Sequence, residues 1–118
     1  MKKVKTIELE SNLLLLDPNN PRLGRNNKFD IDLIEDNGLQ IETYALMNDP
    51  TRSFNIPTLE ESIKRNTFSN IENIWVKKVK DSYLVVEGNR RLTAIKNLLR
   101  NKDDLSKDVL ESILSIEC

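Results

Sequence analysis

The segment of residues 74–99 constrains the fold of this 118-residue chain most strongly. It opens with two runs of apolar and β-branched residues, 74–79 and 83–86, which a short polar connection separates. That arrangement predicts a β-hairpin. From Leu92 onwards the apolar residues follow the spacing of a helix. Because a hairpin continues into a helix, we expect an α/β (α+β) fold, with a small mixed sheet flanked by helices.

The hairpin and the helix are joined by Glu87-Gly88-Asn89-Arg90-Arg91. A glycine after a strand lets the backbone approach a ligand closely. The first amides of a helix lack intrahelical partners, and the helix dipole places partial positive charge there. Arginines in that turn add forked donors that match phosphate oxygens, although each basic residue there is unfavourable by about 0.3–1 kcal/mol. The junction predicts an anion site; the alternative is a surface salt bridge from Glu87 to an arginine.

The rest of the chain carries further signals for local structure. Thr58 and Glu61 form a capping box at the start of a helix that we expect to close at Asn66. Two prolines, a glycine and three Asx residues predict a loop over 17–24. The other predicted elements are strands over 4–10 and 13–16, a short helix over 31–36, helices over 39–47 and 105–112, and an extended segment over 113–118.

Length and composition limit the number of domains and the kinds of catalysis. The length suits one domain. The absence of histidine excludes the usual general base and the commonest metal ligand. The single Cys118 excludes an internal disulfide, and we expect a cytoplasmic protein. No apolar run approaches the roughly 20 residues of a membrane span. The net charge is -1, yet residues 64–100 hold nine Lys/Arg against three Asp/Glu, a local excess of +6 that favours a polyanionic partner.

Four segments share a pattern with a known superfamily. They are Asn20-Pro21-Arg22 after a strand, Leu59-Glu60-Glu61-Ser62-Ile63 on a helix, the strand Ile74-Trp75-Val76, and residues 83–94 with their Gly-x-Arg-Arg turn. In order and spacing these segments resemble the ParB/sulfiredoxin superfamily. They are most similar to the N-terminal, ParB-type nuclease domain of partition proteins, over roughly residues 8–100.

The resemblance implies a nucleotide-phosphate pocket at the turn, in a domain of a DNA-associated protein. The implied ligand is a nucleoside triphosphate, CTP or ATP, with Mg²⁺ as its accompanying ion. Glu87 is the one nearby candidate for a catalytic base in hydrolysis or phosphoryl transfer, and whether the domain is an enzyme stays open. The implied ligand-binding residues are Gly88, Asn89, Arg90 and Arg91 on the turn, with Asn20 and Arg22 on the facing loop.

The chain also departs from that superfamily. Asn89 replaces the acidic residue usual in partition proteins, and without a cysteine near the turn or any histidine we do not expect sulfiredoxin activity. Because residues 113–118 end in an apolar alternating pattern, we expect residues 1–118 to be a single N-terminal domain of a longer protein. Partition proteins continue into a further nucleotide-binding segment and a helix-turn-helix, so CTP hydrolysis and sequence-specific DNA binding stay open.

Two other functions fit the sequence. One is a non-catalytic module that binds DNA or protein and uses the arginines for DNA phosphates. Salt-dependent duplex binding without nucleotide specificity would favour it. The other is a metal-dependent nuclease, for which the sequence shows no second carboxylate beside the turn.

Other residues have alternative interpretations. Trp75 in a strand predicts packing in the core or on a sheet face, with base stacking as the alternative. Lys77, Lys78 and Lys80 predict a solvated hairpin edge, with a nucleic-acid surface as the alternative. The acidic residues of segment 30–36 predict a solvated helix rather than a divalent-ion site.

Overall fold

The predicted hairpin lies at the centre of a three-stranded sheet. The computed structural model describes residues 7–23, 29–52, 54–68 and 74–118. β3 (Trp75–Val79) pairs antiparallel with β4 (Ser82–Glu87) across a two-residue turn in which Lys80 has φ 55°. β2 (Leu14–Leu15) runs parallel to β4, so that the strand order is β2-β4-β3. The predicted mixed α/β class is confirmed.

Side chains of the hairpin alternate between two faces of the sheet. Val76 and Val85 pair across the strands and pack in the main hydrophobic core, on what we call the helix face. Val79 and Leu84 lie on the other, distal face, where they form a small cluster with Ile34. The alternation follows from the period of two in an extended chain.

A second sheet joins segments from the two ends of the chain. β1 (Glu8–Glu10) pairs antiparallel with β5 (Ser115–Glu117), and Leu9 and Ile116 face each other and are buried. The predicted extended segment over 113–118 is wrong at its start, because Ile113 and Leu114 close a helix. The apolar side of β5 is covered within the chain, because β1 pairs with it and Ile116 belongs to the main core. Residues 4–6 of the predicted first strand lie outside the described residues.

Helices form where apolar spacing and caps coincide. α1 begins after Asp36, whose carboxylate accepts a hydrogen bond from the Leu39 amide at 2.9 Å. The capping box at Thr58 is wrong, because α2 begins three residues earlier than an N-cap at Thr58 predicts, after Asn55 in the left-handed region, with Pro57 in its first turn. Ser106 caps α4 through the amide of Val109. The α-helices are α1 (Asn37–Met47), α2 (Ile56–Asn66), α3 (Asn89–Arg100) and α4 (Lys107–Leu114).

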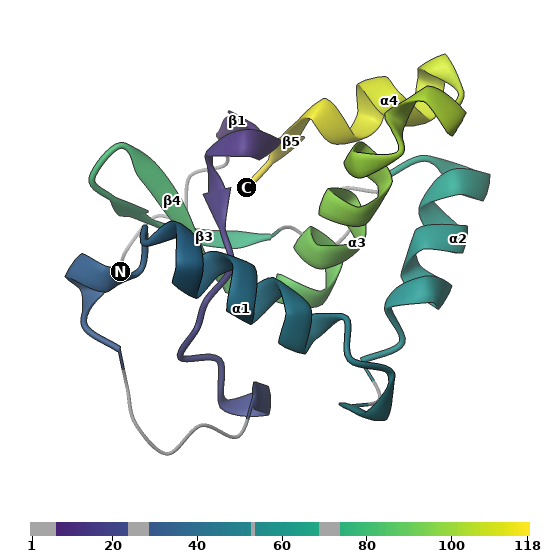
Figure 1. Cartoon of the computed structure of the whole chain (residues 1–118). Coiled ribbons are helices and arrows are strands. Elements are labelled where there is room, and N and C mark those ends of the chain that lie inside the picture. The colour runs from purple at the N-terminus through teal and green to yellow at the C-terminus, as the bar shows by residue number, and fades with distance from the viewer. Residues whose placement is uncertain (1–6, 24–28, 53, 69–73) are drawn as a thin grey trace, which may run out of the picture.

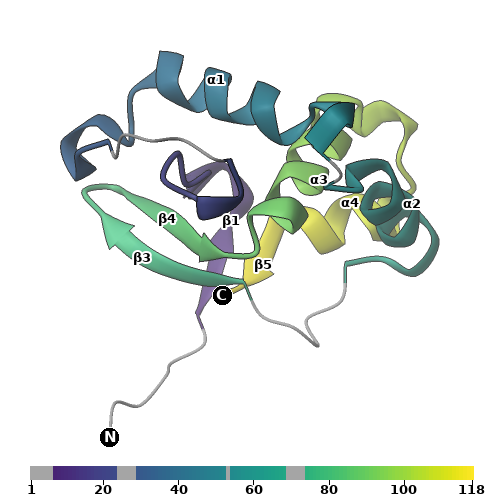
Figure 2. The ribbon, with the colours of Figure 1, turned by 90° about the horizontal axis from the view of Figure 1, so that it is seen from below.

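Short 3-10 turns connect these elements, and the helices enclose the core. Figures 1 and 2 show α2, α3 and α4 grouped on one side of the molecule, the β3–β4 hairpin extending to the other, and α1 spanning both. Leu92, Ile95 and Leu98 of α3 are buried in the main core. Within the described ranges, no helix is long and apolar enough to cross a bilayer. The 3-10 turns are η1 (Ser11–Leu13), η2 (Pro21–Leu23), η3 (Ile31–Leu33), η4 (Pro50–Arg52) and η5 (Lys102–Asp104).

Candidate functional site

The strand-to-helix junction has the predicted geometry. β4 ends at Glu87, Gly88 has φ 108° and ψ 19°, and α3 begins at Asn89. The Leu92 amide donates to the Gly88 carbonyl at 2.9 Å and closes the first turn. In an α-helix each amide donates to the carbonyl four residues earlier, so Leu92 has the first amide that forms such a bond. The three amides of residues 89–91 therefore have no partner within α3. These amides form the N-terminal donor group on which the anion hypothesis depends.

Gly88 is required for a reason that the sequence did not reveal. A Cβ atom placed there would lie 2.9 Å from Cγ1 of Ile74, which is fully buried. The positive φ would also strain any L side chain. The glycine therefore permits the core to pack beneath the turn, in addition to any close approach by a ligand.

A cavity of about 230 Å³ opens at this turn. It brings together residues that lie about 70 positions apart, because β2 runs parallel to β4 and both strands end at the same edge of the sheet. Every residue that the sequence assigned to the site lines it. The lining residues are Asn20, Arg22, Leu59, Val86, Glu87, Gly88, Asn89, Arg90 and Arg91. Sequence reasoning did not assign Leu59 or Val86 to the site: Leu59 was noted only as part of a helical segment, and Val86 only as part of a strand.

Asn89 has a structural role that its place in the motif did not predict. Its side chain is buried, with Oδ1 accepting from the Asp17 amide at 2.9 Å and Nδ2 donating to the Val85 carbonyl at 3.0 Å. Both ends of the amide are thus committed within the protein. The predicted contribution of Asn89 to ligand binding is therefore limited to its backbone amide.

The facing loop is held by its own polar side chains. Asp17 accepts from the Asn19 amide at 2.9 Å, and the Asn20 side chain accepts from the Arg22 amide at 3.1 Å. Burial raises the pKa of the Asp17 carboxyl, and the bond from Asn19 opposes that rise. These short-range bonds set the loop conformation, and the Asn89–Asp17 bond fixes it against the turn. Arg22 is exposed and lines the cavity.

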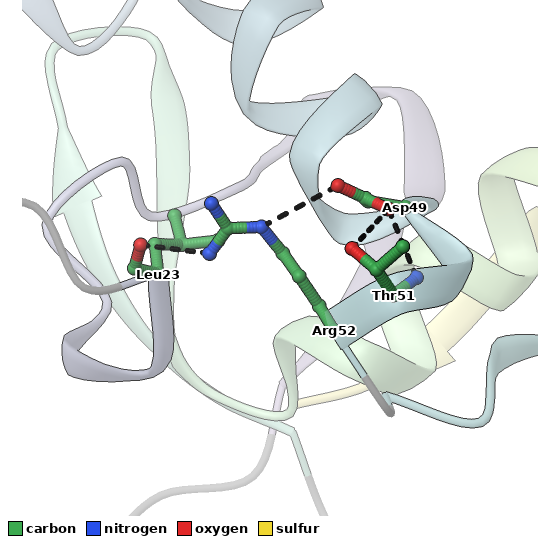
Figure 3. Close-up of polar contacts among 4 residues, drawn as sticks. All are labelled: Leu23, Asp49, Thr51 and Arg52. Carbon is green, nitrogen blue, oxygen red and sulfur yellow. Dashed lines mark hydrogen bonds and ion pairs between the residues drawn. The ribbon is translucent and has the colours of Figure 1, made fainter.

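Arg52 fixes the far end of the loop. Figure 3 shows its guanidinium between the Leu23 carbonyl, to which Nη1 donates at 2.9 Å, and the Asp49 carboxylate, which lies 3.8 Å from Nε. The backbone amide and the hydroxyl of Thr51 donate to Asp49 and lower the pKa of its carboxyl. The only sequence signal for this anchor is the Asp-x-x-Arg spacing before α2.

Arg90 and Arg91 are positioned by contacts with the segments that flank α2. Arg90 Nε donates to the Phe54 carbonyl at 2.7 Å, and the Arg91 guanidinium lies 4.8 Å from the centroid of the Phe68 ring. A guanidinium has five N–H donors, so the Phe54 bond orients Arg90 and uses only one of them. In the described part of the chain, Glu87 forms no ion pair with either arginine, which argues against the salt-bridge alternative.

The cavity is electropositive. The described residues that line it carry three guanidinium groups and one carboxylate, a formal charge of +2, and the N-terminus of α3 adds partial positive charge. Three like charges around one cavity repel each other unless an anion lies between them. The arrangement can bind phosphate or another oxyanion through amides and guanidinium groups together.

Two other sequence hypotheses have structural outcomes. In the acidic segment 30–36, Asp36 caps α1 and residues 31–33 form a 3-10 turn; among the described residues, no group of three or more His, Cys, Asp or Glu is placed to hold a metal. Lys77, Lys78 and Lys80 are exposed on the hairpin, which fits both of their interpretations. Trp75 was expected to pack, yet it is 50% exposed.

In comparisons with known proteins, the chain matches no family model, no curated protein and no solved structure. The function is therefore inferred from the geometry and chemistry of the cavity.

Proposed function

We propose that this chain binds the phosphate groups of a nucleotide, CTP or ATP, in the cavity at the β4–α3 turn, as a ParB-like domain of a DNA-associated protein. The observation that carries the proposal is the convergence of Arg22, Arg90 and Arg91 with the amides at the start of α3 around one cavity. Helix N-termini bind phosphate because their free amides and the helix dipole both favour an anion.

The size of the cavity favours a phosphate chain as its occupant. Pockets that enclose a whole drug-sized ligand usually measure about 300–1,000 Å³. The cavity here is about 230 Å³ and open on one side. It accommodates the phosphates, while a nucleoside would lie at its mouth.

Glu87 would help to bind the metal ion that accompanies a nucleotide. Mg²⁺ is usually bound by one or two carboxylates together with phosphate oxygens and water. Glu87 is exposed and, among the described residues, is the one carboxylate that lines the cavity. It would hold Mg²⁺ beside the phosphates, or accept a proton from an attacking water if the domain catalyses hydrolysis.

A second candidate is a DNA-binding module. The exposed Lys77, Lys78 and Lys80 give the hairpin a basic surface that would bind duplex phosphates without nucleotide specificity. The third candidate, a metal-dependent nuclease acting through two metal ions, needs more carboxylates than the single one found among the described residues that line the cavity.

Titration with tripolyphosphate, ATP and CTP, each with and without Mg²⁺, tests the leading proposal. Because a charge-assisted hydrogen bond contributes about 1.5–3 kcal/mol, Arg90→Ala and Arg91→Ala should each weaken tripolyphosphate binding about tenfold or more. Lys102→Ala, which removes a positive charge from exposed η5, is the matched control and should leave the Kd unchanged. Thermal unfolding of each variant verifies that it is folded.

Two results would contradict the proposal. One is the absence of tripolyphosphate and nucleotide binding by the folded wild-type protein. The other is equal affinity in wild type, Arg90→Ala and Arg91→Ala. If duplex DNA binds with a steep salt dependence while nucleotides do not, the DNA-binding module replaces the leading proposal.

A further inference from the structure

The exposed indole of Trp75 lies on the strand next to the cavity. Trp75 is 50% exposed, although tryptophan is highly buried on average. Among the residues that the structure describes, none forms a hydrogen bond or ring contact with the indole. Single exposed apolar residues are common, but Val86 on the adjacent strand is also 48% exposed. The position of this pair relative to the cavity therefore decides whether it has a role.

A β-bulge places the rim of the cavity on the face of the sheet that carries Trp75. Val76 pairs with Val85 and Trp75 pairs with Glu87, so Val86 is an extra residue in β4. In a regular strand Glu87, two residues after Val85, would lie on the helix face with it. Because directly paired residues share a face, the bulge moves Glu87 onto the distal face beside Trp75.

The bulge thereby connects the indole to the cavity. Val86 and Glu87 both line the cavity, and Trp75 is the cross-strand neighbour of Glu87. Paired side chains have Cβ atoms about 4.5–5.5 Å apart, so the indole lies beside a side chain of the cavity lining, although Trp75 itself is not a lining residue. Lys77 is exposed two residues further along the same face and extends the positive potential.

We propose that Trp75, with Val86 beside it, is the platform on which the base of the bound nucleotide stacks while its phosphates occupy the cavity. This inference rests on the proposed function and names its ligand as a nucleotide rather than inorganic phosphate. Every base presents a π-face to an aromatic ring, so stacking provides affinity with little preference among bases. In this arrangement the residues of the β4–α3 turn bind the phosphates, and Trp75 of β3 contacts the base.

Fluorescence and calorimetry separate these two contributions. Trp75 is the only tryptophan in the chain, so the intrinsic emission of the protein reports on this indole alone. ATP and CTP should quench the emission on binding, whereas tripolyphosphate should bind without comparable quenching. By calorimetry, ATP and CTP should bind the wild type about fivefold or more tightly than tripolyphosphate does, which corresponds to one base–aromatic stack.

Substitutions at Trp75 then test the platform directly. Trp75→Leu keeps an apolar side chain but removes the π-face, and it should reduce ATP and CTP affinity to that of tripolyphosphate without changing tripolyphosphate binding. Trp75→Phe retains an aromatic face and should recover much of the difference. Ile41→Ala, which truncates a 60% exposed apolar residue of α1 outside the cavity lining, is the matched control and should bind like the wild type.

The outcomes distinguish this inference from the proposed function. If tripolyphosphate binds but nucleotides bind no more tightly, or Trp75→Leu binds ATP like the wild type, the platform is overturned and the phosphate site stands. If neither tripolyphosphate nor nucleotides bind, the phosphate site fails and the platform fails with it. Quenching by single-stranded DNA alone would also overturn the inference, in favour of a nucleic-acid partner.

Discussion

Replacing Asn89 by alanine tests whether one buried amide both stabilises the fold and shapes the cavity. The Asn89 side chain accepts from the Asp17 amide at 2.9 Å and donates to the Val85 carbonyl at 3.0 Å. It is thus the polar connection between the end of β4 and the loop that carries Asn20 and Arg22. Truncation removes both bonds and leaves the two backbone groups without these partners.

The expected cost follows from the burial of those groups. A buried polar group that loses its hydrogen-bond partner destabilises a protein by about 1–3 kcal/mol. Val85 is fully buried, whereas Asp17 is half-buried and its amide can recover water. We therefore expect Asn89→Ala to lower the free energy of unfolding by about 2–4 kcal/mol, mostly through the Val85 carbonyl.

Urea unfolding followed by circular dichroism measures this change, and Thr93→Val is its control. Thr93 is fully buried one turn later in α3, and its hydroxyl donates to the Asn89 carbonyl at 2.8 Å. Removing that hydroxyl leaves the carbonyl with its helical partner, so the cost should be only about 0.5–1.5 kcal/mol. Asn89→Asp retains the oxygen that accepts from the Asp17 amide, but it replaces the donating Nδ2 with a second oxygen. That oxygen would face the Val85 carbonyl, and the two acceptors would repel each other. Asn89→Asp should therefore be at least as destabilising as alanine near neutral pH.

The same variants separate stability from binding. Because the Asn89–Asp17 bond positions the loop, Asn89→Ala should weaken tripolyphosphate binding under conditions where the variant is still folded. Thr93→Val should not. If Asn89→Ala destabilises the protein no more than Thr93→Val and binds phosphate equally well, the amide does not fix the loop and our reasoning is refuted.

Two further predictions concern the same region. Gly88→Ala should destabilise the fold by about 1–3 kcal/mol in urea unfolding, because its Cβ meets Ile74 at a strained positive φ. Gly38→Ala, in the first turn of α1, should change stability by less than about 1 kcal/mol, and an equal cost at both glycines would contradict this reason. Burial raises the folded-state pKa of Asp17, so wild-type stability should fall as pH rises from the usual carboxyl pKa of 3.8 through that raised value. Asp17→Asn should remove this slope and stabilise the protein near neutral pH by well under about 1 kcal/mol, allowing for solvent screening; an unchanged slope in thermal melts across pH would contradict it.

The sequence by itself determined the local elements. The hairpin, the turn at Gly88 and the helix after it were predictable because each depends on residues within a few positions of one another. The Gly-x-Arg-Arg turn was predictable from its own residues and the facing loop only from the superfamily resemblance, and the structure places both around one cavity. Boundaries were less accurate, as at Thr58, because Asn55 in the left-handed region starts α2 earlier than the capping pattern indicates.

Only the tertiary structure decided what the residues of the junction do. Gly88 is needed because buried Ile74 lies beneath it, Asn89 bonds to a loop 72 residues away, and the bulge at Val86 turns Glu87 toward Trp75. Each of these depends on the register and packing of segments distant in sequence, whereas spacing patterns report only which neighbours share a face. The pairing of β1 with β5 has the same origin, since burial of Leu9 and Ile116 requires both ends of the chain.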